Sequence, residues 1–219
     1  MSAVLTATAV SKSFAANPRV LDRVDLTAHP GDFLAVAGQP ESGRTTFLRC
    51  LAGGYRPGSG TVVLNTPNAG TVDLATAGAR TLAWIREHHL RSFDGPLAAP
   101  PSQDAAAAVA RAARVERSRA TAALDRLGLA RHADVPLGRL RQGVRRAVAL
   151  AASLSASAPI LLLDEPDTAA DPGLVLDWLD ELRENGTAVI AAVGPASPLI
   201  ASASAAAYLH EGKAQWTRQ

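Results

Sequence analysis

The stretch FLAVAGQPESGRTTFLRCLAGG, residues 33–54, decides the fold class. It opens with an uninterrupted apolar run from Phe33 to Ala37, which is typical of a strand buried in a parallel sheet. A loop bounded by Gly38 and Gly43 follows, and the residues from Thr45 to Leu51 are typical of a helix that stops at a pair of glycines. A strand, a glycine-bounded loop and a helix in this order predict an α/β protein.

The loop has the spacing of a phosphate-binding loop, with glycine, four residues, glycine, a cation and a hydroxyl. Phosphate needs backbone N–H groups, a cation and a helix N-terminus, which this stretch supplies. Two residues depart from the usual pattern. Arg44 replaces the usual lysine with a longer, planar cation. Glu41 brings a carboxylate into the turn, where glycine would adopt backbone angles that glutamate reaches only at a cost. The candidate phosphate-binding residues are Gly38, Ser42, Gly43, Arg44, Thr45 and Thr46.

A second motif, Ile160-Leu-Leu-Leu-Asp-Glu-Pro166, places two carboxylates at the end of another buried strand. Asp164 and the Thr45 hydroxyl are oxygen ligands of the kind that hold Mg²⁺ beside a phosphate. Glu165 is placed to polarise an attacking water and is the candidate catalytic residue. The alternative for the two carboxylates is a surface pair that caps a helix.

Composition limits the class of protein. The chain has 219 residues, of which 47% are hydrophobic and 19% charged, so we expect a globular protein of one large domain or two small lobes that needs no disulfide or structural metal. Its net charge of +2 gives no reason to expect a nucleic-acid partner. The single cysteine, Cys50, excludes an internal disulfide and is expected to be a buried helix residue. We find no secretory leader and no apolar stretch of about 20 residues, so we expect a cytoplasmic protein.

The rest of the chain alternates between strand and helix patterns. β-branched segments predict strands near both ends, and Gly95 to Gln103 reads as a proline-rich loop. The long helical section between Ser92 and Leu154 predicts a helical insertion in an α/β sheet. The predicted strands include Val4–Val10, Val20–Leu26, Thr61–Leu64, Thr71–Leu74, Thr81–Ile85 and Ala188–Val193. The predicted helices include Ala105–Leu127, with a break expected near Arg117–Ser118, Val144–Leu154 and Leu174–Leu182.

Further stretches follow one family pattern in order and spacing: Val10-Ser-Lys-Ser-Phe14, Val20 to Leu26, Ala123 to Leu129, Val148 to Leu154 and Asp164 to Pro172. With the glycine loop, they resemble the nucleotide-binding domain of an ABC-type ATPase over nearly the whole chain. The resemblance implies a P-loop NTPase core with an antiparallel β-subdomain and a helical subdomain, and ATP and Mg²⁺ as cofactors. We expect a single domain over 1–219, with the β-subdomain and α/β core in 1–87 and 155–219 and the helical subdomain in 88–154.

The resemblance also assigns residues outside the loop. The aromatic that stacks on adenine corresponds to Phe14, for which plain core packing is the alternative. The Q-loop glutamine corresponds to Glu87, in the segment Ala83-Trp-Ile-Arg-Glu87, and the D-loop aspartate corresponds to Asp171. The switch histidine corresponds to Gly194, which has no side chain that could reach a phosphate.

The family's signature motif corresponds to Leu140-Arg-Gln-Gly-Val144. In the head-to-tail dimer of the family, this motif closes over the ATP held by the other subunit. Leu140 and Gly143 match the family pattern, whereas Arg141 and Gln142 do not. Arg141 either contacts phosphate as a charged donor or belongs to a solvated basic patch.

The resemblance implies an ATP-binding subunit of an ABC transporter, peripheral at the inner face of the cell membrane. Its expected partners are a membrane-spanning subunit and a second ABC ATPase domain, in a homodimer or a heterodimer. We expect weak or lost ATP hydrolysis, because phosphoryl transfer depends on positioning and electrostatics. Two alternatives remain open: a divergent active ATPase in which Arg44 and Arg141 replace the missing contacts, and a nucleotide-independent pseudo-ATPase that acts as regulator or scaffold. The residues that depart from the family pattern are Glu41, Arg44, Glu87, Arg141, Gln142, Val144 and Gly194.

Overall fold

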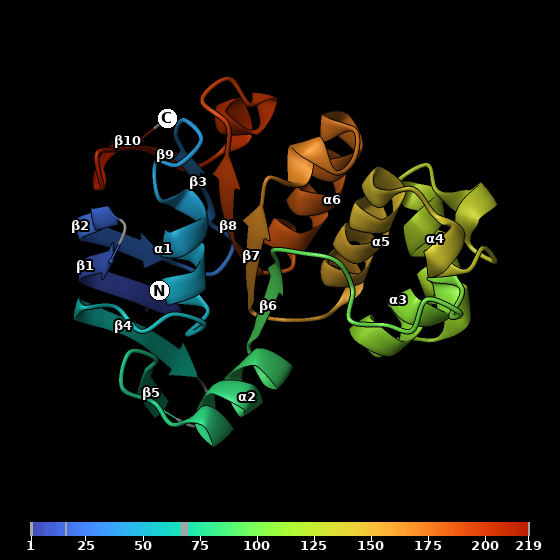
Figure 1. Ribbon diagram of the computed structural model, residues 1–219, viewed down its shortest axis with the longest axis horizontal. Coiled ribbons are helices and arrows are strands. Elements are labelled where there is room, and N and C mark those ends of the chain that lie inside the picture. Colours follow the sequence, from blue (N-terminus) through green and yellow to red (C-terminus); the bar gives the residue numbers. More distant parts are fainter. Residues whose placement is uncertain (1, 16, 67–69, 219) are drawn as a thin grey trace. The chain divides into compact units, whose positions relative to one another are not determined.

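A computed structural model of the protein describes residues 2–15, 17–66 and 70–218 (Figure 1). Contacts within the chain divide it into two compact units. The first unit comprises Met1–Ser92, Ala158–Glu165 and Glu181–Gln219, and the second comprises Phe93–Ser157 and Pro166–Asp180. Each unit is described by itself below. No helix among the described residues is both long and apolar enough to cross a membrane.

One sheet of the first unit is antiparallel and has the strand order β2-β1-β4-β5. β1 pairs with both β2 and β4, and register shifts interrupt both pairings. Leu5, Ala7 and Val10 of β1 are buried and the residues between them are more exposed, which is expected of a sheet with one face on the core and a register shift after Ala7. The sequence predicts a hairpin around Pro67–Gly70, between β4 and β5, and residues 67–69 lie outside the described residues. The strands are β1 (Leu5–Phe14), β2 (Asn17–Ala28), β4 (Ser59–Thr66) and β5 (Gly70–Asp73).

The other sheet has the order β10-β9-β3-β8-β7-β6, in which β9, β3, β8 and β7 run parallel (Figure 1). β3 and β8 are buried along their whole length, so the prediction of a buried parallel sheet is confirmed. β9 and β10 form a hairpin through Glu211 and Gly212, whose φ angles of 47° and 77° fit a two-residue turn. The strands are β3 (Phe33–Ala37), β6 (Leu90–Phe93), β7 (Ile160–Asp164), β8 (Ala188–Val193), β9 (Ala205–His210) and β10 (Lys213–Arg218).

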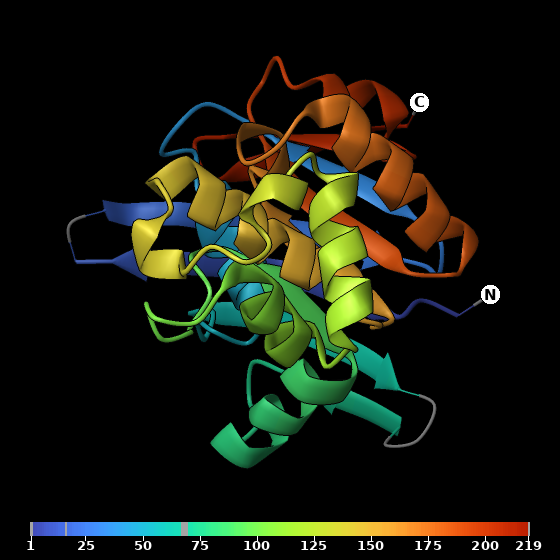
Figure 2. The ribbon, with the colours of Figure 1, turned by 90° about the vertical axis from the view of Figure 1, so that its right-hand side faces the viewer.

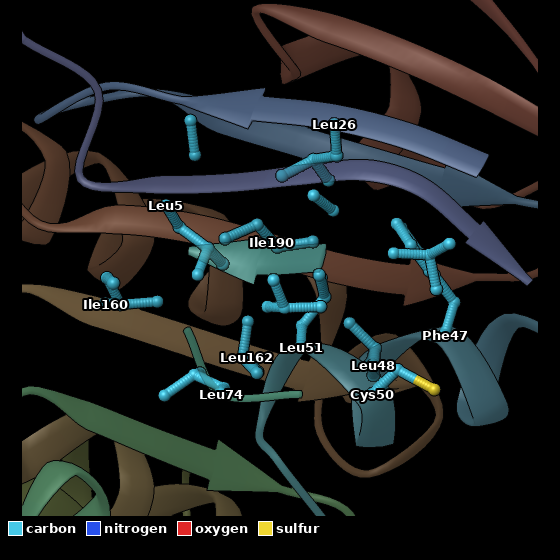
Figure 3. Close-up of a cluster of buried hydrophobic side chains, with 14 of the residues drawn as sticks. Leu5, Leu26, Phe47, Leu48, Cys50, Leu51, Leu74, Ile160, Leu162 and Ile190 are labelled. Atoms are coloured by element: carbon cyan, nitrogen blue, oxygen red, sulfur yellow. The ribbon is translucent and has the colours of Figure 1, made fainter. Parts of the chain in front are cut away.

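Helix α1 (Arg44–Leu51) joins the two sheets of the first unit into one apolar cluster (Figure 3). Its side chains Phe47, Leu48 and Leu51 are buried, and they share this cluster with residues of β1, β4, β7 and β8. Cys50 is buried in the same helix, as predicted, and burial raises the pKa of its thiol to about 11. The start of α1 is therefore fixed by packing on both sheets, which holds the preceding loop in place.

The second unit is built around three helices that pack on one another, α3, α4 and α5 (Figure 2). Arg114, with a φ of 58°, ends the first of them and divides the predicted segment Ala105–Leu127 into two helices. The unit also contains most of the predicted helical segment 88–154. Its helices are α3 (Ala105–Ala113), α4 (Arg117–Arg126), α5 (Gln142–Ser155), the 3₁₀ turns Ala130–His132, Leu137–Arg139 and Pro166–Thr168, and most of α6 (Pro172–Glu184).

The structure corrects one predicted strand. Thr81–Ile85 lies inside helix α2 (Ala79–His88), with Leu82 and Ile85 on its buried side. The prediction was wrong because two isoleucine or leucine residues three positions apart fit a helix face as well as a short strand. The strand in this region is β6, which the sequence reading missed. A further 3₁₀ helix spans Pro198–Ser202.

Candidate functional site

The loop between β3 and α1 is shaped by two glycines that no larger residue could replace without a shift. A Cβ added to Gly38 would lie 2.5 Å from Ser42 Oγ and 2.8 Å from the Leu209 carbonyl oxygen. Gly43 has a φ of 101°, and a Cβ there would lie 2.6 Å from the Val20 carbonyl oxygen. The loop is therefore a tight turn of the kind in which backbone N–H groups line a concave anion site.

The first turn of α1 leaves backbone donors for a ligand. Gly43 precedes the helix and has no side chain that could cap it, and no acidic residue lies in the first turn. The N–H groups of the first helical residues, Arg44, Thr45 and Thr46, have no partner within the helix. These donors and the helix dipole favour an anion at this end of α1.

Two buried side-chain donors in the loop have no hydrogen-bond partner among the described residues. They are Ser42 Oγ and Arg44 Nη1, and Arg44 is only 7% exposed. Buried polar atoms are almost always satisfied in folded proteins. Phosphate oxygens are acceptors of the kind that both donors lack, so the chemistry of the residues present fits this ligand.

Thr45 and Asp164 form the second part of the site. The Thr45 hydroxyl donates to Asp164 Oδ2 at 2.9 Å and lies 3.2 Å from Oδ1, so α1 and the end of β7 meet here. The described residues contain no cluster of three or more His, Cys, Asp and Glu side chains that could hold a metal ion by itself. Mg²⁺ is usually held by one or two protein oxygens together with substrate phosphates, and Thr45 and Asp164 fit that role.

Glu165, the candidate catalytic residue, is bound directly to Arg44, the cation among the candidate phosphate-binding residues. Arg44 Nη2 donates to Glu165 Oε1 at 3.1 Å, and the Glu165 side chain is 37% exposed. The Glu165 backbone has a φ of 52°, and its N–H donates to the Ala192 carbonyl oxygen of β8 at 2.8 Å. Strained left-handed backbone at a residue other than glycine often marks a functional position.

Phe14 lies at the end of β1 and is 40% exposed, so core packing does not account for it. Its ring makes an edge contact with Tyr55, with centroids 5.6 Å apart. Lys12 Nζ lies 5.2 Å from the centroid of the Phe14 ring. An exposed aromatic ring held in this way can stack on a nucleotide base.

In the second unit, the predicted signature residues surround the start of α5. Leu140 is buried, whereas Arg141, Gln142 and Gly143 are exposed, and Arg141 stands at the N-cap position. Asp171 Oδ1 accepts from the N–H groups of Gly173 and Leu174 at 2.9 and 3.3 Å. Asp171 therefore caps α6, and its role as D-loop residue stays a prediction.

The last two predicted positions are Glu87 and Gly194, and only Gly194 lies where the sequence predicts. Glu87 lies inside α2 instead of following a strand, and the residue that follows β6 is Asp94. Asp94 therefore occupies the position after a strand that was predicted for Glu87. The strand before it, Leu90 to Phe93, has only four residues, too few for periodicity to identify it from the sequence. Gly194 directly follows β8, as predicted, and a Cβ there would have no atom within 4 Å.

Comparison with known proteins decides the family. A sequence profile of the family described as ABC transporter matches residues 21–168. The chain belongs to the ABC transporter family. The phosphonates import ATP-binding protein PhnC 1 of Natronomonas pharaonis is 33% identical to this ABC-family chain over 75% of the chain and 70% of its own length.

Other relatives are larger than the chain. The macrolide export ATP-binding/permease protein MacB of Hyphomonas neptunium is 31% identical over 78% of this chain, which spans only 27% of that protein. Among solved structures, a dimeric bacterial ABC transporter cassette has a TM-score of 0.83 at 21% identity, with 98% of each chain covered. At this identity the likeness shows the fold alone, and it confirms the predicted ABC ATPase architecture.

Proposed function

We propose that this chain is the ATP-binding subunit of a transporter and that it binds ATP while hydrolysing it weakly or not at all. The observation that carries the proposal is the pair of buried donors, Ser42 Oγ and Arg44 Nη1, that no described residue satisfies. They lie in a glycine-shaped loop at the start of α1, where phosphate is favoured. The names of the curated relatives, both import and export ATP-binding proteins, support the assignment.

Each part of the chain has a role in this proposal. The N–H groups of Arg44 to Thr46 and the Ser42 hydroxyl donate to phosphate oxygens, and Arg44 offers the cationic charge. Thr45 and Asp164 would hold Mg²⁺, which supplies further charge for the phosphates. The exposed ring of Phe14 stacks on the base.

Hydrolysis needs more than binding. A water must be oriented by a free carboxylate and the developing charge must be stabilised by positioned donors. Glu165 is engaged by Arg44, and Gly194 offers no side chain. Arg141 and Gln142 replace two signature positions, so a partner's site would also be closed poorly. Losses of this kind act on the same transition state, so they lower the rate together without simply adding.

The proposal includes two kinds of partner. A membrane-spanning subunit would couple this chain to transport and would hold it at the inner face of the cell membrane. A second ATPase domain would complete each nucleotide site, as a homodimer or a heterodimer. The name of the export relative joins ATP-binding and permease in one protein, and a cassette of the same fold was solved as a dimer, which supports both partners.

The test is a calorimetric titration of the full chain with Mg-ATP, together with a phosphate-release assay. We expect binding that Thr45→Val weakens at least about fivefold, because the substitution removes the hydroxyl that meets Asp164. Thr121→Val, on an exposed face of α4, is the matched control and should leave binding unchanged. Absence of binding at millimolar ATP would favour the nucleotide-independent scaffold. Steady phosphate release that Glu165→Gln abolishes would favour a divergent active ATPase.

A further inference from the structure

The contact between Arg44 and Glu165 joins two residues that are 121 positions apart. Arg44 begins α1 and is almost fully buried, whereas Glu165 follows β7 and is about one-third exposed. Within this pair the buried guanidinium receives its neutralising charge from the carboxylate. A buried cation without a partner would be costly, so the contact is favourable as long as no other anion is present.

We propose that the Glu165 carboxylate competes with the nucleotide phosphate for Arg44, and so acts as an inhibitory anion built into the site. The inference rests on the proposed function, since it assumes that phosphate binds in the loop after β3. Binding of phosphate breaks the bond between Arg44 Nη2 and Glu165 Oε1. The free energy of that contact is therefore subtracted from the binding free energy.

The arginine is what makes the competition effective. Its planar guanidinium presents two terminal nitrogens that match the paired oxygens of a carboxylate or a phosphate. Nη2 is taken by Glu165, and Nη1 is buried without a partner among the described residues. The carboxylate thus satisfies only one of the two terminal nitrogens of the guanidinium. A phosphate group carries more charge and could satisfy both nitrogens, which makes exchange possible.

The backbone holds Glu165 in the competing position. Its φ of 52° is a conformation that a residue with a Cβ adopts at a cost, and the bond from its N–H to Ala192 keeps it there. The main chain of Glu165 is therefore fixed beside β8, and the side chain reaches Arg44 from this position. It is presented to the cation by two neighbouring strands of the parallel sheet, β7 and β8.

A simpler explanation must be separated from competition. Any negative charge near the loop repels phosphate through space, so Glu165→Gln would tighten binding under either explanation. Glu165→Asp separates them, because it keeps the charge but shortens the side chain by one methylene and loses the 3.1 Å contact. Competition predicts tighter binding for both variants, whereas repulsion alone predicts it only for Glu165→Gln.

The experiment measures the affinity of the full chain and its variants for Mg-ATP by calorimetry. We expect Glu165→Gln and Glu165→Asp each to tighten binding about threefold to tenfold, which is the range of one lost charge-assisted contact. Adenosine, which has no phosphates, should bind all three proteins alike. Glu184→Gln and Glu184→Asp, at the end of α6, are matched controls that should not change the affinity.

The outcomes separate this inference from the proposed function. If the unaltered chain binds Mg-ATP and Glu165→Asp does not tighten binding, the competition is refuted and the proposed function stands. If only the Glu165 variants bind, the competition stands and the unaltered chain is not an ATP-binding subunit by itself. If no variant binds at millimolar ATP, both are refuted. Thermal unfolding of each variant without ligand verifies that it is folded.

Discussion

Glu41→Gly is the substitution whose effect can be worked out most fully from the loop. Glu41 is exposed and has a φ of 66°, in the left-handed region. A residue with a Cβ pays roughly 1–2 kcal/mol for this conformation, while glycine gives up about 0.5–1 kcal/mol to the entropy of the unfolded chain. With mid-range values the net gain is about 0.75 kcal/mol, which raises Tm by about 1.5–3 °C in a chain of this size.

The same substitution removes a carboxylate from the loop between β3 and α1, where we propose that phosphate binds. The Coulomb repulsion between exposed unit charges about 4 Å apart is roughly 1 kcal/mol, so Mg-ATP should bind up to about fivefold more tightly. Glu41→Gln keeps the strained backbone and removes only the charge. It should therefore tighten binding to a similar extent without raising Tm.

The assay combines thermal unfolding of the ligand-free chain with calorimetric titration. Glu211→Gly, at another left-handed glutamate with a φ of 47°, is the control for strain and should raise Tm by a similar amount. The reasoning is refuted if Glu41→Gly unfolds at the same temperature as Glu41→Gln. It is also refuted if Glu41→Gln binds Mg-ATP no more tightly than the unaltered chain.

Two further predictions test the loop and the second unit. Gly43→Ala should lower the free energy of unfolding by about 2–3 kcal/mol, measured by urea unfolding, because it adds both left-handed strain and a contact of 2.6 Å with the Val20 carbonyl oxygen. Gly186→Ala, with a φ of 86° and open space around its Cβ, should cost only about 1 kcal/mol, and equal losses would contradict the contact. Asp104→Ala should cost about 1 kcal/mol at pH 7, since Asp104 Oδ1 caps α3 through the Ala107 N–H at 2.8 Å and lies 2.9 Å from Arg117 Nη1. Desolvation alone would raise the pKa of Asp104, but the bonds from Ala107 and Arg117 outweigh it and hold the pKa below the ordinary 3.8. The charged form therefore stabilises the fold above pH 3.8, and the advantage over Asp104→Asn should disappear as the pH falls through the lowered pKa. A constant advantage down to pH 2 would contradict this.

The fold could be predicted where a segment's pattern had only one structural solution. The runs 33–37 and 160–163 are apolar on both faces, and only a strand covered on both sides accommodates them at this length. Thr81–Ile85 was ambiguous because a five-residue window contains little more than one helical turn. β6 has four residues, so the pairing with its neighbour β7, which a sequence does not display, decides its conformation.

In the site, too, features set by one segment could be predicted from the sequence, whereas contacts between distant segments could not. The cost of Glu41 could be anticipated, since the spacing of the loop specifies which position takes the left-handed angles, and the φ of 66° agrees. The pairing of Arg44 with Glu165 could not be anticipated. It depends on how far a buried guanidinium reaches from α1 toward the end of β7, and this distance is set by the packing of α1 on the sheets.

The pairing changes how the departures from the family pattern should be counted. Considered one at a time, Arg44 is an altered residue and Glu165 a retained one, which suggests a site that has lost its cation geometry but kept its base. In the structure the altered residue binds the retained one. A carboxylate held by a buried guanidinium has its oxygen directed at that cation instead of at a water, so the presence of Glu165 is no sign that hydrolysis is retained. Under the proposed function, the arginine at position 44 therefore bears on both phosphate binding and water activation, through its 3.1 Å contact with Glu165.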